Sequence, residues 1–349
     1  MKSRNVAILS LPLDNNYGFV LQQWALYHVL EQNGFKPCIL NRRWNRLKTN
    51  FVSKVKTFIY LHTICFPFYS FWKKMVHSPE IRTSNELRDY VSYGGYDTVI
   101  VGSDQVWRIE FTRGADLNYF FDFLDGVNVK KISYAPSFGV DEWNGSSDET
   151  MKIAQLLRKF DCLSVREQSG VSLCQRYFNM NVDCVLDPTL LLKESDYLKF
   201  IKKKRQKKGY VATYILDKSE VKNAFIKKIA GNMPIYPLYE RRHKYSLYKS
   251  IEEWLTTIYY ADFVVVDSFH GMVFSILFGK QFYVIANGRR GNSRFISLLK
   301  KLGLENRLVC DELEKSDVMK NKISYDEVFQ RLDNLRENSY SFLLSALNN

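Results

Sequence analysis

One of the five histidines, His270, stands where side chains of α/β proteins often act on ligands. It follows residues 263–266, an unbroken run of β-branched and aromatic residues typical of a strand buried on both faces of a parallel sheet. Residues 267–271 are expected to form a polar turn, and 272–278 a helix. The turn would place Ser268, His270 and free backbone N–H groups at a sheet edge and a helix N-terminus, where α/β folds bind anions.

Two electrostatic effects on His270 oppose each other. The positive end of the following helix favours a neutral imidazole, whereas a bound phosphate would favour the imidazolium. The charge of the ring would therefore depend on the ligand. The alternative is that His270 only caps the helix at the end of its strand.

Polar residues also follow four predicted strands in the first half of the chain, at 98–101, 131–135, 162–165 and 182–186. The residues after them read G-S-D-Q-V-W (Gly102 to Trp107), P-S-F-G (Pro136 to Gly139), Arg166-Glu167 and D-P-T (Asp187 to Thr189). The carboxyl ends of parallel strands share one edge of a sheet, which is where α/β proteins build their sites. This convergence indicates a site more strongly than any single motif.

The chain opens with a similar unit. Residues 6–11 are a predicted strand, 19–32 a predicted helix and 36–40 a second strand, with a loop rich in turn formers at 12–18. The pattern G-x-G-x-x-G is absent, so the loop is not a dinucleotide-binding fingerprint. The loop either binds a ligand or only forms the turn and caps the helix.

Composition bounds the function. A chain of 349 residues is longer than a domain with a single hydrophobic core usually is, so two domains are expected. The net charge of +13 predicts an anionic partner, which would be a nucleic acid, an acidic membrane or a phosphorylated substrate.

The six cysteines lack metal-binding spacing and are typical of a reduced cytosolic protein. Neither a secretory signal nor a spanning segment is evident, and the absence of known metal and nucleophile motifs favours metal-free chemistry.

Residues 42–77 interleave lysines and arginines with aromatic residues. One helical face collects apolar residues and a histidine: Phe51, Val55, Phe58, Ile59 and His62. Pro67 is expected to break this pattern. A basic amphipathic helix pair, with Phe58, Phe71 and Trp72 as anchors, would suit an anionic membrane surface. The alternative is an ordinary covering helix pair with a solvated basic face.

A domain boundary is expected near residue 190, ahead of a charge run at 202–208 that is interpreted as a solvated helix end. A second α/β series follows it. We therefore expect an N-terminal domain at 1–190, a C-terminal domain at 191–323, and a helix at 324–349 that packs across their junction.

Seven blocks of the sequence resemble the polysaccharide pyruvyl transferase family and occur in that family's order. They are N-Y-G-F-V-L-Q-Q-W-A-L (Asn16 to Leu26), V-G-S-D-Q-V-W (Val101 to Trp107), S-Y-A-P-S-F-G (Ser133 to Gly139), S-V-R-E (Ser164 to Glu167), L-D-P-T-L-L (Leu186 to Leu191), D-S-F-H-G (Asp267 to Gly271) and S-R-F-I-S-L-L-K-K-L-G-L (Ser293 to Leu304). The resemblance runs from about Asn5 to Leu304.

The resemblance implies a fold like that of GT-B glycosyltransferases, an α/β architecture in which two Rossmann-like domains with parallel sheets face a cleft. It also implies phosphoenolpyruvate as a co-substrate, no separate cofactor and no metal. The product would be a pyruvate ketal bridging two hydroxyls of one sugar. The N-terminal domain would hold the acceptor and the C-terminal domain the donor.

The family's donor site uses an arginine and a histidine that match Arg166 and His270. Many members also have an arginine two residues before that histidine, where this chain has Ser268. One anion contact must therefore come from elsewhere, and Arg294 is preferred over Arg289 or Arg290 because it lies in a matching block. The expected donor-binding residues are Arg166, Ser268, Phe269, His270, Gly271 and Arg294.

We expect His270 to act as the acid or to assist the leaving phosphate, and a carboxylate of the opposite domain to act as the base. Asp104 is preferred and Asp14 is the second candidate, although Asp104 would equally well only cap the turn that follows it. The expected acceptor-binding residues are Asn15, Asn16, Tyr17 and Gln105.

The resemblance further implies a galactose-type sugar on a lipid-linked precursor of a surface or capsular polysaccharide. If the carrier is an isoprenoid diphosphate, the protein would work at the cytoplasmic face of the inner membrane. Two rival functions remain open: a glycosyltransferase of the same architecture that uses a sugar nucleotide, and a non-catalytic glycan or nucleic-acid binder. Nucleic acid is disfavoured because the basic aromatic segment is helical in pattern and lacks a stacking sheet with its motifs.

Overall fold

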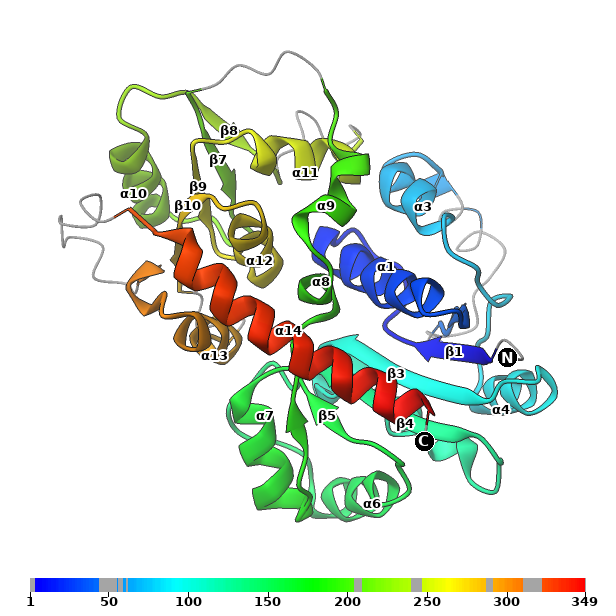
Figure 1. Ribbon diagram of the computed structural model, residues 1–349. Coiled ribbons are helices and arrows are strands. Elements are labelled where there is room, and N and C mark those ends of the chain that lie inside the picture. Colours follow the sequence, from blue (N-terminus) through cyan, green and yellow to red (C-terminus); the bar gives the residue numbers. More distant parts are fainter. Residues whose placement is uncertain are drawn as a thin grey trace.

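The computed structural model describes residues 4–43, 55, 59–60, 62–203, 209–239, 247–286, 291–309 and 322–348. These residues form an α/β protein with two larger parallel sheets (Figure 1). One sheet comes from the first half of the chain and the other from the second half. A long C-terminal helix crosses between them.

The first sheet contains four parallel strands in the order β2-β1-β3-β4. Their bounds are Asn5–Leu9 for β1, Lys36–Leu40 for β2, Thr98–Asp104 for β3 and Lys130–Pro136 for β4. Ile8 of the central strand β1 pairs with Ile39 on one side and Ile100 on the other. Side chains are buried on both faces of β1 and β3, as in a parallel sheet covered on each side.

A short parallel pair continues this sheet beyond β4. It consists of β5 (Ser164–Val165) and β6 (Asp183–Cys184). The backbone N–H of Ser133 in β4 donates to the Cys162 carbonyl at 3.0 Å, just ahead of β5. The carboxyl ends of β3, β4, β5 and β6 therefore lie along one edge, and the residues after them can meet there.

Helices of the first half cover this sheet. Their bounds are Tyr17–Gln32 for α1, Phe66–Trp72 for α3, Ser84–Tyr93 for α4, Ile109–Thr112 for α5, Ser147–Leu157 for α6, Gln168–Leu173 for α7 and Pro188–Leu191 for α8. The helices α4 and α6 begin with capping boxes, formed by Thr83 with Glu86 and by Ser146 with Glu149. Helix α1 is buried almost all round because it packs against β2 and β3 and also against α3, α8 and α12.

The second sheet contains five parallel strands in the order β11-β10-β9-β7-β8. Their bounds are Val211–Tyr214 for β7, Ile235–Pro237 for β8, Phe263–Val266 for β9, Gln281–Ile285 for β10 and Leu308–Val309 for β11. The helices of this half are α9 (Glu194–Tyr197), α10 (Glu220–Ala230), α11 (Ile251–Tyr259), α12 (Phe269–Leu277) and α13 (Ser293–Leu302).

The C-terminal helix α14 (Tyr325–Asn348) contacts α13 of the second half and α8 of the first. Figure 1 shows it running diagonally across both halves. Ser339 accepts a hydrogen bond from the Leu186 N–H at 2.9 Å, and Arg336 Nε donates to the Leu190 carbonyl at 2.9 Å. These bonds attach α14 to α8 and to the segment just before it.

Several element boundaries differ from the sequence expectations. Helix α1 begins at Tyr17 rather than 19, since the Asn16 side chain accepts from the Phe19 N–H and caps it. Helix α12 begins at Phe269 rather than 272, so the turn after β9 is shorter than predicted. Pro67 does not break a helix; it lies in the first turn of α3, where its missing N–H costs no hydrogen bond.

Two of the proposed membrane anchors are core residues. Phe71 and Trp72 are 1% and 7% exposed, and the Phe71 ring lies 6.3 Å from that of Trp24 in α1. Phe68 is buried in the same way, 4.7 Å from the Tyr17 ring. The prediction of Phe71 and Trp72 as anchors is wrong because α1 presents an aromatic face that α3 must cover. Phe58, Arg289, Arg290 and most of the 202–208 charge run lie outside the described residues.

In the described part of the chain, no helix is both long enough and apolar enough to cross a membrane. The cysteines described there, Cys38, Cys65, Cys162, Cys174 and Cys184, are free thiols.

Candidate active site

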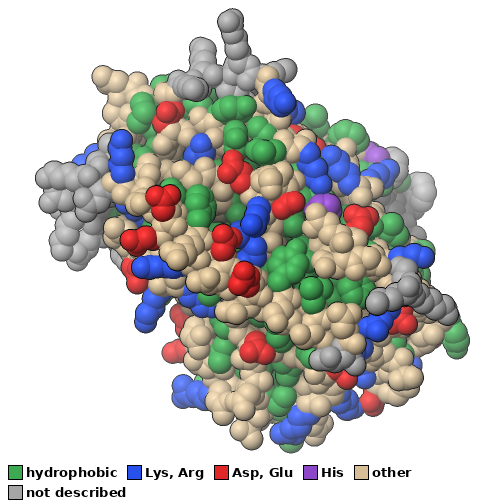
Figure 2. Space-filling view, viewed as in Figure 1, with side chains coloured by type: hydrophobic (Ala, Val, Ile, Leu, Met, Phe, Trp, Pro, Cys, Tyr) green, Lys and Arg blue, Asp and Glu red, His purple; other side chains and the backbone are tan. Residues whose placement is uncertain are grey.

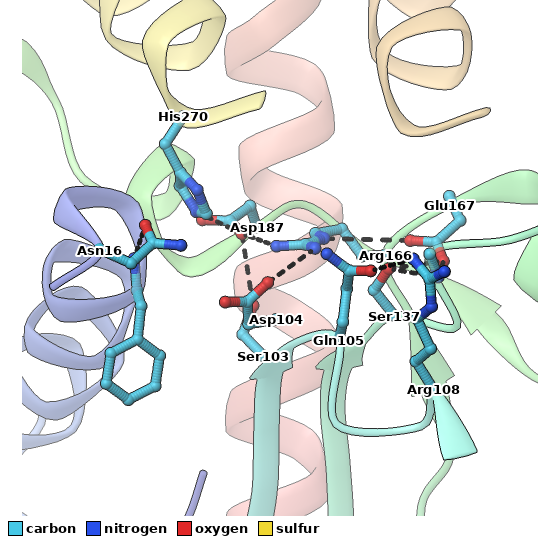
Figure 3. A network of polar contacts seen from close by, with 12 residues as sticks. Asn16, Ser103, Asp104, Gln105, Arg108, Ser137, Arg166, Glu167, Asp187 and His270 are labelled. Carbon is cyan, nitrogen blue, oxygen red and sulfur yellow. Dashed lines mark hydrogen bonds and ion pairs between the residues drawn. The ribbon is translucent and has the colours of Figure 1, made fainter. Parts of the chain in front are cut away.

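Asp187 is the centre of a buried polar cluster at the carboxyl edge of the first sheet (Figure 3). Its Oδ2 accepts from Arg166 Nη1 at 2.6 Å and from the Ser103 hydroxyl at 3.3 Å, and it lies 3.5 Å from His270 Nε2. Its Oδ1 accepts from the Thr189 N–H at 3.0 Å and so caps α8. Burial alone would raise the pKa of Asp187, but His270 and Arg166 outweigh it and hold that pKa well below its ordinary value.

Arg166, directly after β5, faces three carboxylates. Besides the bond to Asp187, its Nη2 lies 3.5 Å from Asp104 Oδ1 and its Nε lies 3.9 Å from Glu167 Oε2. Burial works to lower the pKa of Arg166, but these carboxylates raise it above its ordinary value. The guanidinium is therefore a permanent cation whose charge the protein already compensates.

Glu167 holds the loop after β4 in place. Its Oε1 accepts from the Ser137 hydroxyl at 2.8 Å and from the Phe138 N–H at 3.0 Å. Gly139, in the same loop, has a φ of +68° and approaches Gly291 so closely that a Cβ on Gly291 would lie 2.3 Å from the Gly139 carbonyl oxygen. The two halves of the chain thus touch beside the cluster.

The end of β3 is strained where it delivers Asp104. Ser103 and Asp104 have φ values of +26° and +67°, and Ala135 at the neighbouring end of β4 has +54°. Residues with side chains rarely adopt this left-handed region, and such strain gathers at functional sites. The bend turns Asp104 toward Arg166, and its side chain keeps 10% exposure while that of Asp187 keeps none.

His270 comes from the second half of the chain and reaches the cluster from α12. Its ring rests on the first turn of α1: a Cβ added to Gly18 would lie 2.0 Å from His270 Nδ1. Its other nitrogen, Nε2, is buried and points toward Asp187 (Figure 3). Gly18 is therefore the residue that leaves room for this imidazole.

Phe269 and Arg294 complete the second half's contribution. The Phe269 ring lies 4.8 Å from the Arg166 guanidinium carbon and 5.9 Å from that of Arg294, close enough for cation–π contact with both. Burial, followed by the neighbouring charge of Arg166, lowers the pKa of Arg294 to about 10. Helix α13, which carries Arg294, packs against α7 just after Glu167, and Ser297 Oγ accepts from the Gln168 N–H at 3.2 Å.

Gln105 lies at the edge of this cluster, where its Oε1 accepts from Arg108 Nη1 at 3.1 Å (Figure 3). Buried polar atoms of the cluster without a hydrogen bond in the described structure include His270 Nε2, Arg166 Nε and Nη2, and Glu167 Oε2. Native proteins rarely leave such atoms unbonded. Their concentration here, together with the strained backbone, identifies this cluster as the candidate active site.

The structure thus brings together Arg166, His270, Asp104, Phe269, Arg294 and Gln105 of the residues selected from the sequence. Ser268 precedes α12 and is 9% exposed, but its side chain makes no capping bond. Gly271 serves packing, because a Cβ there would lie 2.9 Å from Val266 Cγ1.

Of the residues proposed from the loop before α1, Asn16 lies beside the cluster (Figure 3), and all of them make contacts outside it. Tyr17, predicted to contact the acceptor, is fully buried, stacks on Trp254 at 5.3 Å and donates to the Lys249 carbonyl. Asn15 donates to the Tyr248 hydroxyl at 2.5 Å, and the Asn16 side chain caps α1. Asp14 is exposed and accepts only the Asn15 N–H among the hydrogen bonds described for it.

Sequence reasoning assigned no role to Asp187, Glu167 or Ser103. Asp187 carried a signal, since an aspartate between a predicted strand and a proline is well placed to cap a helix at the sheet edge. Glu167 and Ser103 belong to the polar blocks at the strand ends, but their individual roles could not be predicted because their partners are distant in sequence. Among the described residues no group of His, Cys, Asp and Glu could hold a metal ion.

The fold resembles those of solved epimerases and glycosyltransferases. Similar solved structures include a putative UDP-N-acetylglucosamine 2-epimerase from Listeria monocytogenes, with 10% identity, 100% of this chain and 97% of that chain covered, and a TM-score of 0.58. The UDP-GlcNAc 2-epimerase from Neisseria meningitidis bound to UDP-GlcNAc has 10% identity, 99% coverage of both chains and a TM-score of 0.54. A glycosyltransferase from Rickettsia africae has 9% identity, 99% and 94% coverage, and a TM-score of 0.51. At these identities the likeness shows the fold alone, and it confirms the expected GT-B-like α/β architecture.

No curated protein matches the sequence. The family comparison gives a match that covers most of the chain: residues 16–289 match the family described as polysaccharide pyruvyl transferase. The matched range contains Asp104, Arg166, Asp187 and His270, the residues that meet in the cluster. The chain therefore belongs to the polysaccharide pyruvyl transferase family and is a transferase.

Proposed function

We propose that this protein transfers the pyruvyl group of phosphoenolpyruvate to two hydroxyls of one sugar, forming a ketal and releasing phosphate. The observation that carries the proposal is the meeting of His270, from the second half of the chain, with Asp187, Arg166 and Asp104 of the first. An imidazole beside carboxylates and arginines supplies proton transfer and anion binding at one place.

Ketal formation from an enol phosphate has three chemical requirements. The methylene carbon must gain a proton, a sugar hydroxyl must attack the resulting cationic carbon, and phosphate must leave when the second hydroxyl attacks. Each hydroxyl loses its proton as it attacks. One acid, one base and a clamp for the donor's carboxylate and phosphate therefore supply all the steps.

We assign the acid to His270 and the base to Asp104. Asp187 is fully buried and already bonded to Arg166, Ser103 and Thr189, so it orients its neighbours and does not touch substrate. Asp104 retains some exposure and makes a looser contact with Arg166, at 3.5 Å. It is thus the carboxylate of this group that a sugar hydroxyl can reach.

The donor's carboxylate and phosphate need a cation to bind them. Arg166 already contacts three carboxylates, so we expect it to hold the side chains of the site in position and to contribute less to binding the donor's anionic groups. We propose that Arg294 takes the anion contact for which Ser268 has no guanidinium. Burial and the neighbouring Arg166 lower the pKa of Arg294 to about 10, which still leaves its guanidinium protonated at neutral pH and able to bind an anion.

Donor access requires movement. His270 Nε2 is buried and the ring is packed on Gly18, so phosphoenolpyruvate can reach it only when the contact between α1 and α12 opens. We propose that residues 1–190 carry the acceptor and residues 191–323 the donor, with α14 holding the two parts together as they move.

The test is incubation with phosphoenolpyruvate and a panel of free and lipid-linked galactosides, with phosphate release and acceptor mass followed together. We expect phosphate release that depends on both substrates, and an acceptor mass increased by pyruvate less one water. Transfer of a sugar from a sugar nucleotide, with phosphoenolpyruvate inert, would instead establish the glycosyltransferase reading.

We further propose that the acceptor is carried on a lipid and that the protein works on an anionic membrane surface at the cytoplasmic face. In Figure 2 basic side chains gather over α3 with hydrophobic side chains beside them. With Phe71 and Trp72 buried, the exposed apolar residues described in this region include Ile59 at 53%, Tyr60 at 39% and Phe66 at 47%. Apolar side chains beside lysines suit the boundary between headgroups and acyl chains.

Flotation with vesicles containing phosphatidylserine tests this surface. We expect wild-type protein to float with anionic vesicles and remain below with neutral ones. Replacing Ile59, Tyr60 and Phe66 together by serine should abolish flotation, whereas replacing the exposed Tyr93 and Val221 on other elements should not. Equal flotation of both variants would remove this surface from membrane binding.

A further inference from the structure

A pocket of about 300 Å³ opens between β6, α13 and α14, outside the polar cluster. Its wall combines apolar side chains with a lysine, a thiol and hydrogen-bonding groups. The lining residues are Asp183, Cys184, Val185, Leu186, Lys301, Leu335, Asn338, Ser339 and Phe342. This volume is at the lower end of the range for small-molecule sites, so an occupant would be small.

The positively charged side chain of this pocket, Lys301, lies beside an uncharged group. Its Nζ lies 3.1 Å from Cys184 Sγ, and burial raises the pKa of that thiol, which is therefore uncharged at neutral pH. Within the described chain no carboxylate lies at ion-pair distance from Lys301. Asp183 is the only acidic residue of the lining, and its side chain is exposed. Because a half-buried ammonium beside an uncharged thiol has lost part of its hydration, an anionic ligand would stabilise it.

The rest of the wall sets the shape of that partner. Leu335 and Phe342 of α14 form an apolar side of the pocket together with Val185 and Leu186. The exposed amide of Asn338 adds a hydrogen-bond donor at the rim. An anion with a short apolar body fits this combination better than a bare inorganic ion does.

We propose that this pocket binds a small organic anion, with its charged group on Lys301 and its apolar part against Leu335 and Phe342.

The pocket is connected to the active site through the backbone. Leu186 lines the pocket, and the next residue is Asp187, the centre of the polar cluster. The Leu186 N–H donates to Ser339 Oγ, also in the lining, at 2.9 Å. An occupant that contacts both β6 and α14 would stiffen this attachment. We therefore expect occupancy to change turnover, a consequence that rests on the proposed function, whereas binding itself does not.

Alkylation of Cys184 by iodoacetamide, followed by peptide mass spectrometry, measures binding without reference to catalysis. The probes are hexanoate, its neutral analogue hexanamide, and inorganic phosphate. At ten times its Kd hexanoate should slow Cys184 alkylation about elevenfold, because only free protein reacts. The half-buried Cys162 in the same digest serves as the internal reference and should be unaffected.

Matched variants identify the contact. Lys301→Met should abolish the protection, and Lys300→Met, which removes an exposed charge one residue away, should leave it intact. Calorimetric titration of hexanoate into the same proteins gives the same comparison if the thiol reacts slowly. Protection by phosphate equal to that by hexanoate would contradict the apolar part of the proposal. Equal protection by hexanamide, protection unchanged in Lys301→Met, or no binding by either method would overturn the site.

Discussion

Replacing Gly18 by alanine should impair catalysis through His270 without unfolding the protein. The added Cβ would lie 2.0 Å from His270 Nδ1 and 2.2 Å from its Cγ, whereas ordinary contact begins at 3.4 Å. The difference, 3.4 − 2.0, requires the ring to move by about 1.4 Å. Gly18 lies in the first turn of α1 and has no positive φ, so the backbone itself accepts alanine.

The expected magnitudes follow from this displacement. A misplacement of about 1 Å at a catalytic group can cost about 100-fold in rate, which corresponds to about 2.7 kcal/mol of transition-state stabilisation. Stability should change less, because overpacking costs about 1–3 kcal/mol and alanine recovers up to about 1 kcal/mol in a helix. We expect kcat/KM for phosphoenolpyruvate-dependent phosphate release to fall about 100-fold. The variant should still unfold in urea in one cooperative transition, which shows that it is folded.

Two further variants separate this cause from a general disturbance. Gly170→Ala also adds a Cβ to a buried helical glycine, but its nearest contact is 3.2 Å, so activity should stay close to wild type. In a His270→Ala background, where activity is lost, the comparison is made on stability, and Gly18→Ala should no longer lower the urea midpoint through overpacking, since the ring that it displaces is gone. Wild-type activity in Gly18→Ala, or the same loss of stability with and without the His270 ring, would refute the reasoning.

Three other predictions concern the carboxylates and metal ions. Asp104→Asn should lower kcat at least about 100-fold because it removes the base. The control Asp14→Asn changes an exposed carboxylate, and its kcat should stay within about twofold of the wild-type value. Steady-state kinetics of the two variants make the comparison. Asp187→Asn should destabilise the fold by about 3–5 kcal/mol because it leaves Arg166 buried without its closest partner. The pKa of Asp187 is lower in the folded protein than in the unfolded chain, so its carboxylate stabilises the fold fully at pH values above the unfolded pKa. The difference in the free energy of unfolding between wild type and Asp187→Asn, measured with urea, should therefore be constant from about pH 8 to pH 5 and shrink as the pH falls through about 4. Finally, phosphate release should be unchanged by EDTA, and a requirement for added Mg²⁺ would contradict a mechanism built on His270, Asp104 and arginines without a metal ion.

The sheet framework was predictable because parallel strands are encoded locally. Residues 263–266 and 36–40 form strands with the bounds expected from their apolar runs. The polar residues after the strands of the first half do meet at one edge, as the topology of parallel sheets requires. Helix starts were less predictable, because the Asn16 cap and the Pro67 position depend on local hydrogen bonds that hydrophobic periodicity does not report.

The site was predictable only in part, for a different physical reason. His270 and Arg166 stand at strand ends, so their position follows from local pattern together with the family resemblance. The role of Asp187 depends on contacts with residues that are far away in sequence, and so does the burial of Tyr17 against Trp254. Periodicity identifies that Phe71 and Trp72 are apolar, but not whether they face a lipid or the helix α1.

The most direct test of the central claim is the mass of the product formed from phosphoenolpyruvate and a sugar acceptor in deuterium oxide. If an acid of the site protonates the methylene carbon, each ketal should carry one deuterium in its methyl group and appear with one phosphate. His270→Ala should lose both together. An acceptor that gains no pyruvyl group while phosphoenolpyruvate is consumed, or a ketal formed at the wild-type rate by His270→Ala, would contradict the account.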